Sequence, residues 1–321
     1  MAETRIDYGI PRFYYLDFHG PEPIKLTEAM TGLIPSRNLY AYRTPMKLTP
    51  LYQNNNGNRA GSMIYLTHGG GPLPLLGEPS HRELVDFLTQ IPATLINHSA
   101  ILIISAHWEE AVPTIISGRS PDLLFDYYGF PEESYAITYP APGAPELAGE
   151  IHRLFLDKGL PAKLDDQRGF DHGVFIPLKI MYPKADIPCL QVSLLDTLNP
   201  EDHLQLGKVL GQLRHENLLI IGSGSSFHNL RAFRESPSET SRRDNEAFER
   251  WLMESVAGEG LSDDEQERRL RQWHLAPAAR YCHPREEHLL PLHVCYGIAS
   301  QPAARVYTMG LMGKQVSACI W

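Results

Sequence analysis

The feature that most constrains the fold is an alternation, from Ser62 onward, of short apolar runs with longer stretches of helical period. Several runs are apolar at every position, which is typical of parallel strands buried on both faces of a sheet. Strands that alternate with helices form a sheet with crossover helices. We therefore predict an α/β fold, a single domain with a central, mostly parallel sheet flanked by helices. The predicted strands are residues 62–67, 100–105, 111–117, 187–194, 217–222 and 304–310, and the predicted helices are residues 80–96, 144–158, 200–214, 243–257, 263–274 and 284–299.

The N-terminal part of the chain does not follow this alternation. Residues 1–60 mix aromatic residues and prolines with polar residues, and the tract QNNNGN at 53–58 is typical of a loop. We expect residues 1–60 to form an arm that wraps the main domain, and residues 61–321 to form that domain.

Composition excludes several classes of partner. The net charge is -9, and no basic cluster is long enough to follow a phosphate backbone, so nucleic acid is not an expected partner. The sequence has no secretory signal pattern and no run near the roughly 18 apolar residues of a membrane span, so we expect a cytoplasmic protein that does not enter membranes. The 4 cysteines form no CxxC pair, and we expect reduced, buried thiols.

Three of the 14 histidines, His68, His107 and His228, come shortly after the carboxyl ends of predicted strands. In open α/β sheets the ligand site lies at the carboxyl ends of the strands, so these imidazoles can converge. Neutral nitrogen ligands suit Zn(II) or Fe(II) and argue against Ca(II) or Mg(II). The glycine-rich turns at 69–71 and 222–224 would leave room for a bound molecule.

Two more segments hold candidate site residues. His172 follows Asp171 at the start of an apolar segment, where the imidazole is either a general base near neutral pH or an incidental residue at a helix start capped by Asp171. In CHPREEHLLPL, the proline suits the first turn of a helix. Glu287 and His288 would diverge on that helix, so we expect His283 to face the site.

Parts of these motifs occur in two other enzyme classes. HGGG at 68–71 is also the form of the oxyanion-hole loop in lipase-like hydrolases, but the chain has no G-x-S-x-G nucleophile elbow. GSGSSF at 222–227 has only the first half of a dinucleotide-binding G-x-G-x-x-G motif and lies late in the chain. A metal site is therefore the interpretation that the residues favour.

Five motifs, in this order, resemble those of the DODA-type extradiol aromatic ring-opening dioxygenases, within the wider class III extradiol family related to the protocatechuate 4,5-dioxygenase beta subunit. The resemblance covers the chain from about residue 62 to its C-terminus and not residues 1–60. The motifs are THGGGPLPLLGE, SAHWE, FDHGVFIPLKIMYPKADIPCLQVSLL, IIGSGSSFHNLR and HPREEHLLPL.

The resemblance implies a catalytic domain in residues 61–321 with one non-haem Fe(II), often found as Zn(II) in purified members. It implies that His68, His107 and His228 bind the metal, that His172 is the acid/base histidine, and that His283 lines the pocket. The wider family commonly has a glutamate at the position of His228. The implied reaction uses O2 to open a catechol ring next to the diol, after His172 takes a proton from one hydroxyl.

The implied partners are a small aromatic diol, such as DOPA or another carboxylated catechol, and O2. Arg119, Arg168 and Arg231 are candidates for binding the tail of such a substrate, and the sequence does not rank them. It does not indicate the oligomeric state either. Two alternatives stay open at this point. One is a non-catalytic metal-binding or partner-binding protein of the same fold, and the other is a zinc-dependent hydrolase that uses a metal-bound water.

Overall fold

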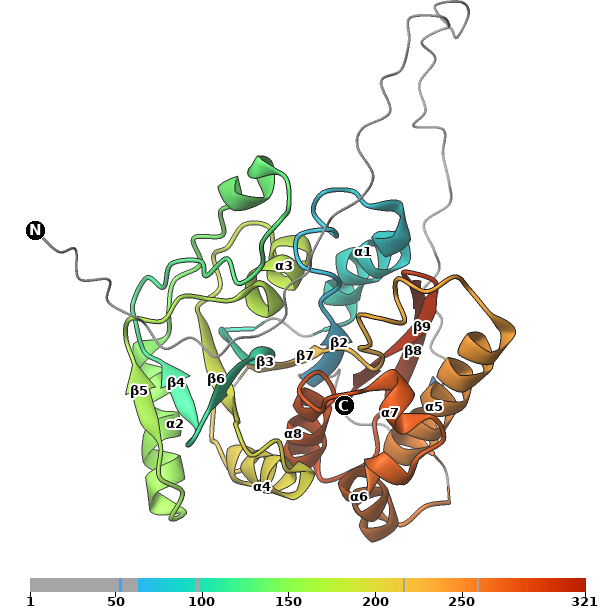
Figure 1. Cartoon of the computed structure of the whole chain (residues 1–321). Coiled ribbons are helices and arrows are strands. Elements are labelled where there is room, and N and C mark those ends of the chain that lie inside the picture. Colours follow the sequence, from blue (N-terminus) through green and yellow to red (C-terminus); the bar gives the residue numbers. More distant parts are fainter. Residues whose placement is uncertain (1–51, 54–62, 96–97, 216, 259) are drawn as a thin grey trace, which may run out of the picture.

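The apolar runs of the sequence form one sheet at the centre of the structure (Figure 1). The structure is a computed structural model that describes residues 52–53, 63–95, 98–215, 217–258 and 260–321. The strands within these residues are β1 (Tyr52–Gln53), β2 (Met63–Thr67), β3 (Ala100–Glu110), β4 (Thr114–Ile116), β5 (Lys163–Asp165), β6 (Cys189–Leu195), β7 (Leu218–Gly224), β8 (Arg305–Leu311) and β9 (Lys314–Ile320).

The α-helices of the same residues lie between and after these strands. They are α1 (Arg82–Gln90), α2 (Pro145–Asp157), α3 (His172–Met181), α4 (Pro200–Leu210), α5 (Glu239–Ala257), α6 (Asp263–Arg271), α7 (Ala279–Cys282) and α8 (Leu290–Ala299). Each of the six strands and six helices predicted from the sequence overlaps an observed element of the same type, which confirms the α/β fold class.

The strand order in the sheet is β1-β8-β9-β2-β7-β3-β6-β4-β5. The central strands β2, β7, β3 and β6 are all parallel to their neighbours within this group. The added strands on the β2 side, β9, β8 and β1, are antiparallel, and β4 is antiparallel to β6. Because the four central strands are parallel, their carboxyl ends meet at one edge of the sheet, where the candidate residues cluster.

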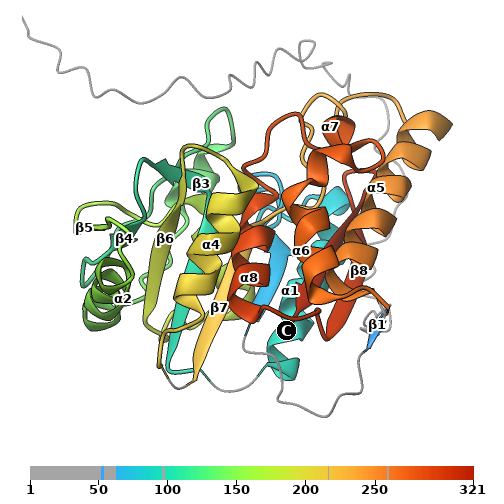
Figure 2. The same cartoon turned by 90° about the horizontal axis from the view of Figure 1, so that it is seen from below.

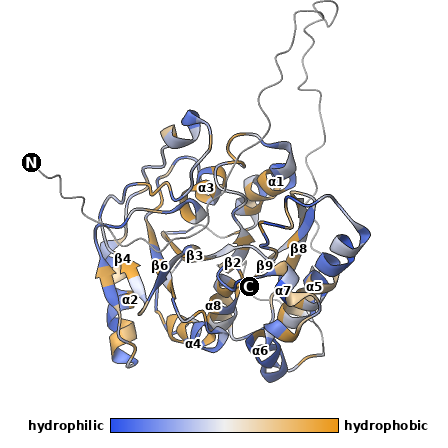
Figure 3. Ribbon diagram, viewed as in Figure 1, coloured by the Kyte–Doolittle hydropathy of each residue, from blue (hydrophilic) through white to orange (hydrophobic). Residues whose placement is uncertain are grey.

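Helices cover both faces of the sheet, with α1 and α3 on one face and α2, α4 and α8 on the other (Figures 1 and 2). The side chains of β3 alternate between the two faces of the sheet, and both faces are apolar and need to be covered. Ile101 and Ile103 pack into the core of the α1 and α3 face, whereas Leu102 and Ile104 pack with the helices of the opposite face. Colouring by hydropathy shows the same layering, with apolar residues concentrated on the sheet and on the helix faces that meet it (Figure 3).

The sequence prediction missed the short elements β1, β5 and α7 and the longer elements α3 and β9. For α3 and β9 the reasons differ. All residues of α3 except Lys179 and Ile180 are buried, so the helix has no polar face to produce a 3.6-residue period. β9 pairs with β8 through a two-residue turn, Met312 and Gly313, both with positive φ. Such turns usually carry Asn-Gly or Asp-Gly, which makes Met-Gly hard to recognise.

The predicted end of the second strand was wrong. β3 runs to Glu110, so His107 lies within the strand and not after it. The pairing of β3 with β6 shifts its register between Ile104 and Glu109, and this irregularity turns the His107 segment out of the regular ladder.

Most of the expected N-terminal arm, residues 1–60, lies outside the described residues; Tyr52 and Gln53 pair with β8. All four cysteines are free and buried. Among the helices that the structure describes, none combines the length and apolar character that crossing a bilayer requires. The expected cytoplasmic location stays a prediction.

Candidate metal centre

His68, which follows β2, is buried, and its ring is held by a serine of β7. Its Nδ1 lies 2.9 Å from Ser223 Oγ, and that hydroxyl donates to the carbonyl of Gly173 at 2.5 Å. Since the serine hydrogen is used in this way, Ser223 accepts from His68, and the proton of the imidazole is on Nδ1. The Nε2 lone pair of His68 therefore faces the other way, toward His107.

His107 and His172 share one carboxylate, that of Asp126. Asp126 Oδ1 lies 2.8 Å from Nδ1 of His172, and Asp126 Oδ2 lies 3.4 Å from Nδ1 of His107. The two rings are adjacent, with centroids 3.9 Å apart. Asp126 comes from the long connection between β4 and α2, and nothing in the sequence around it indicated a role.

His228 and His288 share a second carboxylate, that of Glu287. Glu287 Oε1 lies 3.2 Å from His228 Nδ1 and 3.0 Å from His288 Nδ1. The two rings stack with centroids 3.3 Å apart. Arg285 forms a two-pronged ion pair with Glu109 of β3 and also lies 3.4 Å from Glu287 Oε2, which ties this turn to the sheet.

The pair His228 and His288 lies beside the group formed by His68, His107 and His172. The ring of His288 is 5.2 Å from that of His68 and 4.9 Å from that of His107, centroid to centroid. Each of the five imidazoles has its Nδ1 beside an oxygen of Ser223, Asp126 or Glu287. An imidazole whose Nδ1 is used in this way offers Nε2 to a metal ion or a substrate.

The two Nε2 atoms of His68 and His107 test whether a metal fits, because they lie only 3.0 Å apart. Nδ1 of His68 donates to Ser223, and Nδ1 of His107 faces the carboxylate of Asp126 at 3.4 Å. With the ring protons on these Nδ1 atoms, the two Nε2 lone pairs face each other, which is repulsive unless a cation lies between them. Bonds of 2.0–2.1 Å to one tetrahedral ion would place two nitrogens about 3.3 Å apart. The separation is close to that value, so the donor set fits a divalent transition metal.

Burial keeps three of these imidazoles, those of His68, His107 and His288, in the neutral form. It holds the pKa of His68 and of His107 well below the ordinary value, with neighbouring histidines adding to the effect, and it lowers the pKa of His288 to about 4. Burial alone would also lower the pKa of His172, but Asp126 outweighs it and the pKa is raised. The neutral imidazoles of His68, His107 and His288 are suited to metal binding, whereas His172 is suited to exchanging a proton.

His283, predicted to line the pocket, lies near His228, Glu287 and His288 but is not one of the five clustered imidazoles. It is buried, with Nε2 2.7 Å from the carbonyl of Ser226, and its ring packs against Phe248 and Trp273. Among the residues that the structure describes, two groups have ligand atoms within 4.8 Å of one another, and His283 belongs to neither. The groups are His68, His107 and His172, and His228, Glu287 and His288.

The reason for choosing His283 over His288 was wrong. The segment from Pro284 to Leu289 forms turns, and α8 begins only at Leu290, so Glu287 and His288 do not diverge on a helix. Both side chains reach the same group. The sequence analysis expected a helix from residue 284, and the structure has a non-helical segment there.

Three other expectations concern individual contacts. Asp171 precedes α3 but makes no side-chain cap, because its carboxylate accepts from Ser105 and Gln191. Asp126 caps the helix instead, accepting from the backbone N–H of His172 at 3.0 Å. Of the three arginines considered for the substrate tail, only Arg168 lies beside the site.

The guanidinium of Arg168 donates to the His107 carbonyl and lies over the ring of Trp108. The side chains of Arg119 and Arg231 are 79% and 91% exposed, and each pairs with a surface glutamate.

The glycine turn after His68 is closely packed against neighbouring segments. Gly69 and Gly71 have positive φ, which only glycine adopts without strain. A Cβ on Gly69 would lie 2.6 Å from Pro74, and one on Gly71 would lie 3.3 Å from Phe130. The turn therefore needs glycine for its backbone shape and for close packing next to His68.

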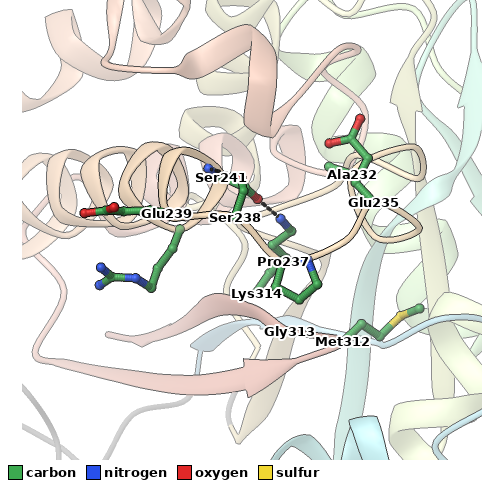
Figure 4. Close-up of a pocket in the computed structure, with 10 residues that line it drawn as sticks. Ala232, Glu235, Pro237, Ser238, Glu239, Ser241, Met312, Gly313 and Lys314 are labelled. Carbon is green, nitrogen blue, oxygen red and sulfur yellow. Dashed lines mark hydrogen bonds between the residues drawn. The ribbon is translucent and has the colours of Figure 1, made fainter.

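A cavity of about 400 Å³ lies outside this group, between the start of α5 and the β8–β9 turn (Figure 4). Lys314 reaches into this region and donates to Ser241 and to the hydroxyl of Tyr281. None of the five clustered histidines lines the cavity. It is thus separate from the candidate metal centre.

Comparison with known proteins decides the family. Residues 63–318 match the family described as the catalytic LigB subunit of aromatic ring-opening dioxygenase. The chain belongs to this family. Its relatives include dioxygenase tasH of Hapsidospora irregularis, 40% identical over 81% of this chain and 85% of that protein. Another is 4,5-DOPA dioxygenase extradiol of Mirabilis jalapa, 34% identical over 74% of this chain and 86% of that protein.

The fold is also similar to that of a solved structure. An uncharacterized protein from Escherichia coli K12 superimposes with a TM-score of 0.63 at 25% identity, over 81% of this chain and 99% of that one. The resemblance to DODA-type extradiol dioxygenases is therefore confirmed, and the chain is an enzyme of the extradiol dioxygenase class. The buried histidine group is compatible with a metal site in such an enzyme.

Proposed function

We propose that the chain is a non-haem Fe(II)-dependent extradiol dioxygenase that uses O2 to open the ring of a catechol next to its diol. The observation that best supports a bound metal is the pair of facing Nε2 atoms of His68 and His107, 3.0 Å apart, with both Nδ1 atoms beside oxygens of other residues. Relatives named 4,5-DOPA dioxygenase extradiol support a DOPA-like or other carboxylated catechol as the substrate.

In this proposal His68, His107 and His228 hold the metal, as expected from the sequence, and His288 is a further imidazole at the same place. The metal, when bound, supplies the site for the catecholate oxygens and for O2. Nε2 of His172 receives the proton of a catechol hydroxyl, because Nδ1 of the same ring is engaged by Asp126. Imidazole ligands bring no negative charge to the metal, so the charge of the catecholate would balance that of the ion.

The test is to mix the anaerobic Fe(II)-loaded protein with DOPA, caffeate and protocatechuate in turn, and then to admit O2. We expect one O2 consumed per molecule of a yellow semialdehyde product with at least one of them. The zinc-loaded protein should bind the catechol without turnover, since Zn(II) is redox-inert. Binding without O2 uptake by the iron form would favour a non-catalytic protein, and hydrolysis without O2 uptake would favour a zinc hydrolase.

Substitutions separate the roles. His172→Phe should abolish turnover and leave bound metal near one equivalent, measured by elemental analysis. His68→Ala, His107→Ala and His228→Ala should each lose the metal. Normal turnover by His172→Phe would show that another group takes the proton.

A further inference from the structure

The long connection between β4 and α2 places one carboxylate at the candidate site. It is anchored to the segment before α3, because Leu124 N donates to Phe170 O and Phe170 N donates to Asp122 O, both at 2.8 Å. Two residues beyond Leu124, the side chain of Asp126 is only 19% exposed. A carboxylate held by such fixed backbone contacts is well placed to orient what it touches.

Asp126 contacts His172 twice through the same oxygen. Oδ1 accepts from the backbone N–H of His172 at 3.0 Å and from its Nδ1 at 2.8 Å. The first bond fixes the carboxylate at the N-terminus of α3, where negative charge is favoured. The second then fixes the ring. The neighbouring carboxylate of Asp171 is turned away to Ser105 and Gln191, so it does not compete for this ring.

We infer that Asp126 is the positioning residue for His172, holding its imidazole in one orientation and in the Nδ1–H tautomer. A carboxylate can only accept, so the ring nitrogen facing it must carry the proton. In the neutral ring, Nε2 is then the lone-pair nitrogen and lies on the side of the ring away from Asp126. Edge contact with Tyr127 and the adjacent ring of His107 restrict rotation of the imidazole further. This inference rests on the proposed function for its catalytic consequence.

The experiment compares Asp126→Asn and Asp126→Ala with Asp122→Asn, an exposed aspartate of the same connection that gives the same charge change. In the iron-loaded enzyme we expect Asp126→Ala to lower kcat about 10- to 100-fold, with KM for the catechol changed less than about 3-fold and bound metal unchanged. Asp126→Asn keeps one acceptor oxygen and should retain more of kcat. Asp122→Asn should match the wild type.

A second readout is independent of turnover. Long-range ¹H–¹⁵N spectra of the zinc-loaded protein should show the His172 ring protonated on Nδ1 in the wild type and in Asp122→Asn, and a mixture of tautomers in Asp126→Ala. If the ring keeps one tautomer in Asp126→Ala, or if kcat is unchanged, the inference is wrong.

Metal loss that accounts for the whole fall in kcat would also overturn the inference, because Asp126 would then act through His107. A wild-type protein without any dioxygenase turnover would contradict the proposed function, while the spectra would still decide the role of Asp126.

Discussion

At the scale of single residues, carboxylates decide how the imidazoles are presented. Glu287 is 7% exposed and contacts two of them, and these contacts hold its own pKa far below the ordinary value although burial alone would raise it. A buried carboxylate of this kind fixes ring orientation and raises the basicity of a metal ligand. Glu287 therefore prepares the His228 and His288 side of the site, as Asp126 does on the other side.

Replacing Glu287 should weaken metal binding. We expect Glu287→Gln to lower the affinity for Zn(II) about 10- to 100-fold, because a neutral amide holds the two Nδ1–H groups less strongly. The measurement is competition with a chromogenic chelator. Glu286→Gln is the matched control, since Glu286 pairs with Arg280 and not with the imidazoles. Equal affinities of the two variants would contradict this role.

A second carboxyl group makes stability depend on pH. Glu249 is fully buried beside Ser317, and burial raises its pKa from the ordinary 4.5 to about 7. The folded state thus binds the proton more tightly than the unfolded chain. The stabilisation is complete below about pH 4.5 and is lost as pH rises through about 7, by up to about 3 kcal/mol.

Urea unfolding at pH 5 and pH 8.5 tests this assignment. Wild type should lose more free energy of unfolding between the two pH values than Glu249→Gln, whereas Glu254→Gln, an exposed residue of the same helix, should behave as wild type. Parallel losses in all three proteins would show that Glu249 does not titrate in this range.

At the scale of elements, glycines set how closely helices approach. α4 and α8 approach each other closely where Gly207 faces the backbone of Val294 and Gly297 faces the backbone of Leu204. A Cβ at either position would overlap a carbonyl oxygen of the other helix. Since α8 follows the turn that holds Glu287 and His288, this contact also supports the candidate metal centre.

Alanine substitutions measure that contact. Gly207→Ala and Gly297→Ala should each destabilise the protein by about 1–3 kcal/mol, because the helices must move apart. Gly149→Ala in α2 is the control, since its Cβ would meet nothing within 4 Å. It should stabilise by about 0.5–1 kcal/mol through helix propensity. Thermal unfolding gives all three values, and a neutral Gly207→Ala would contradict the close approach.

At the scale of the whole molecule, the site joins distant parts of the chain. His68, His107, His172, His228 and His288 come from five separate segments, and only folding brings them together. A metal that binds this arrangement and not the unfolded chain stabilises the fold. The gain is about 2.7 kcal/mol when the free metal is at 100 times its Kd.

Chelation should therefore lower the melting temperature of the metal-loaded protein, and Zn(II) should restore it. His68→Ala should show no such shift. His274→Ala removes an exposed histidine and should respond as the wild type does. An unchanged melting temperature of the wild type after complete removal of the metal would contradict a metal site formed by folding.

The sequence by itself determined the α/β architecture, because buried parallel strands require unbroken apolar runs and their covering helices require amphipathic ones. It also made His68, His107 and His228 candidate ligands, because residues near the carboxyl ends of parallel strands share one edge of the sheet. It did not reveal Asp126, Glu287 or His288. These lie in turns and connections without periodicity, and which imidazole each contacts depends on packing between segments far apart in the chain, so only the tertiary structure decided it.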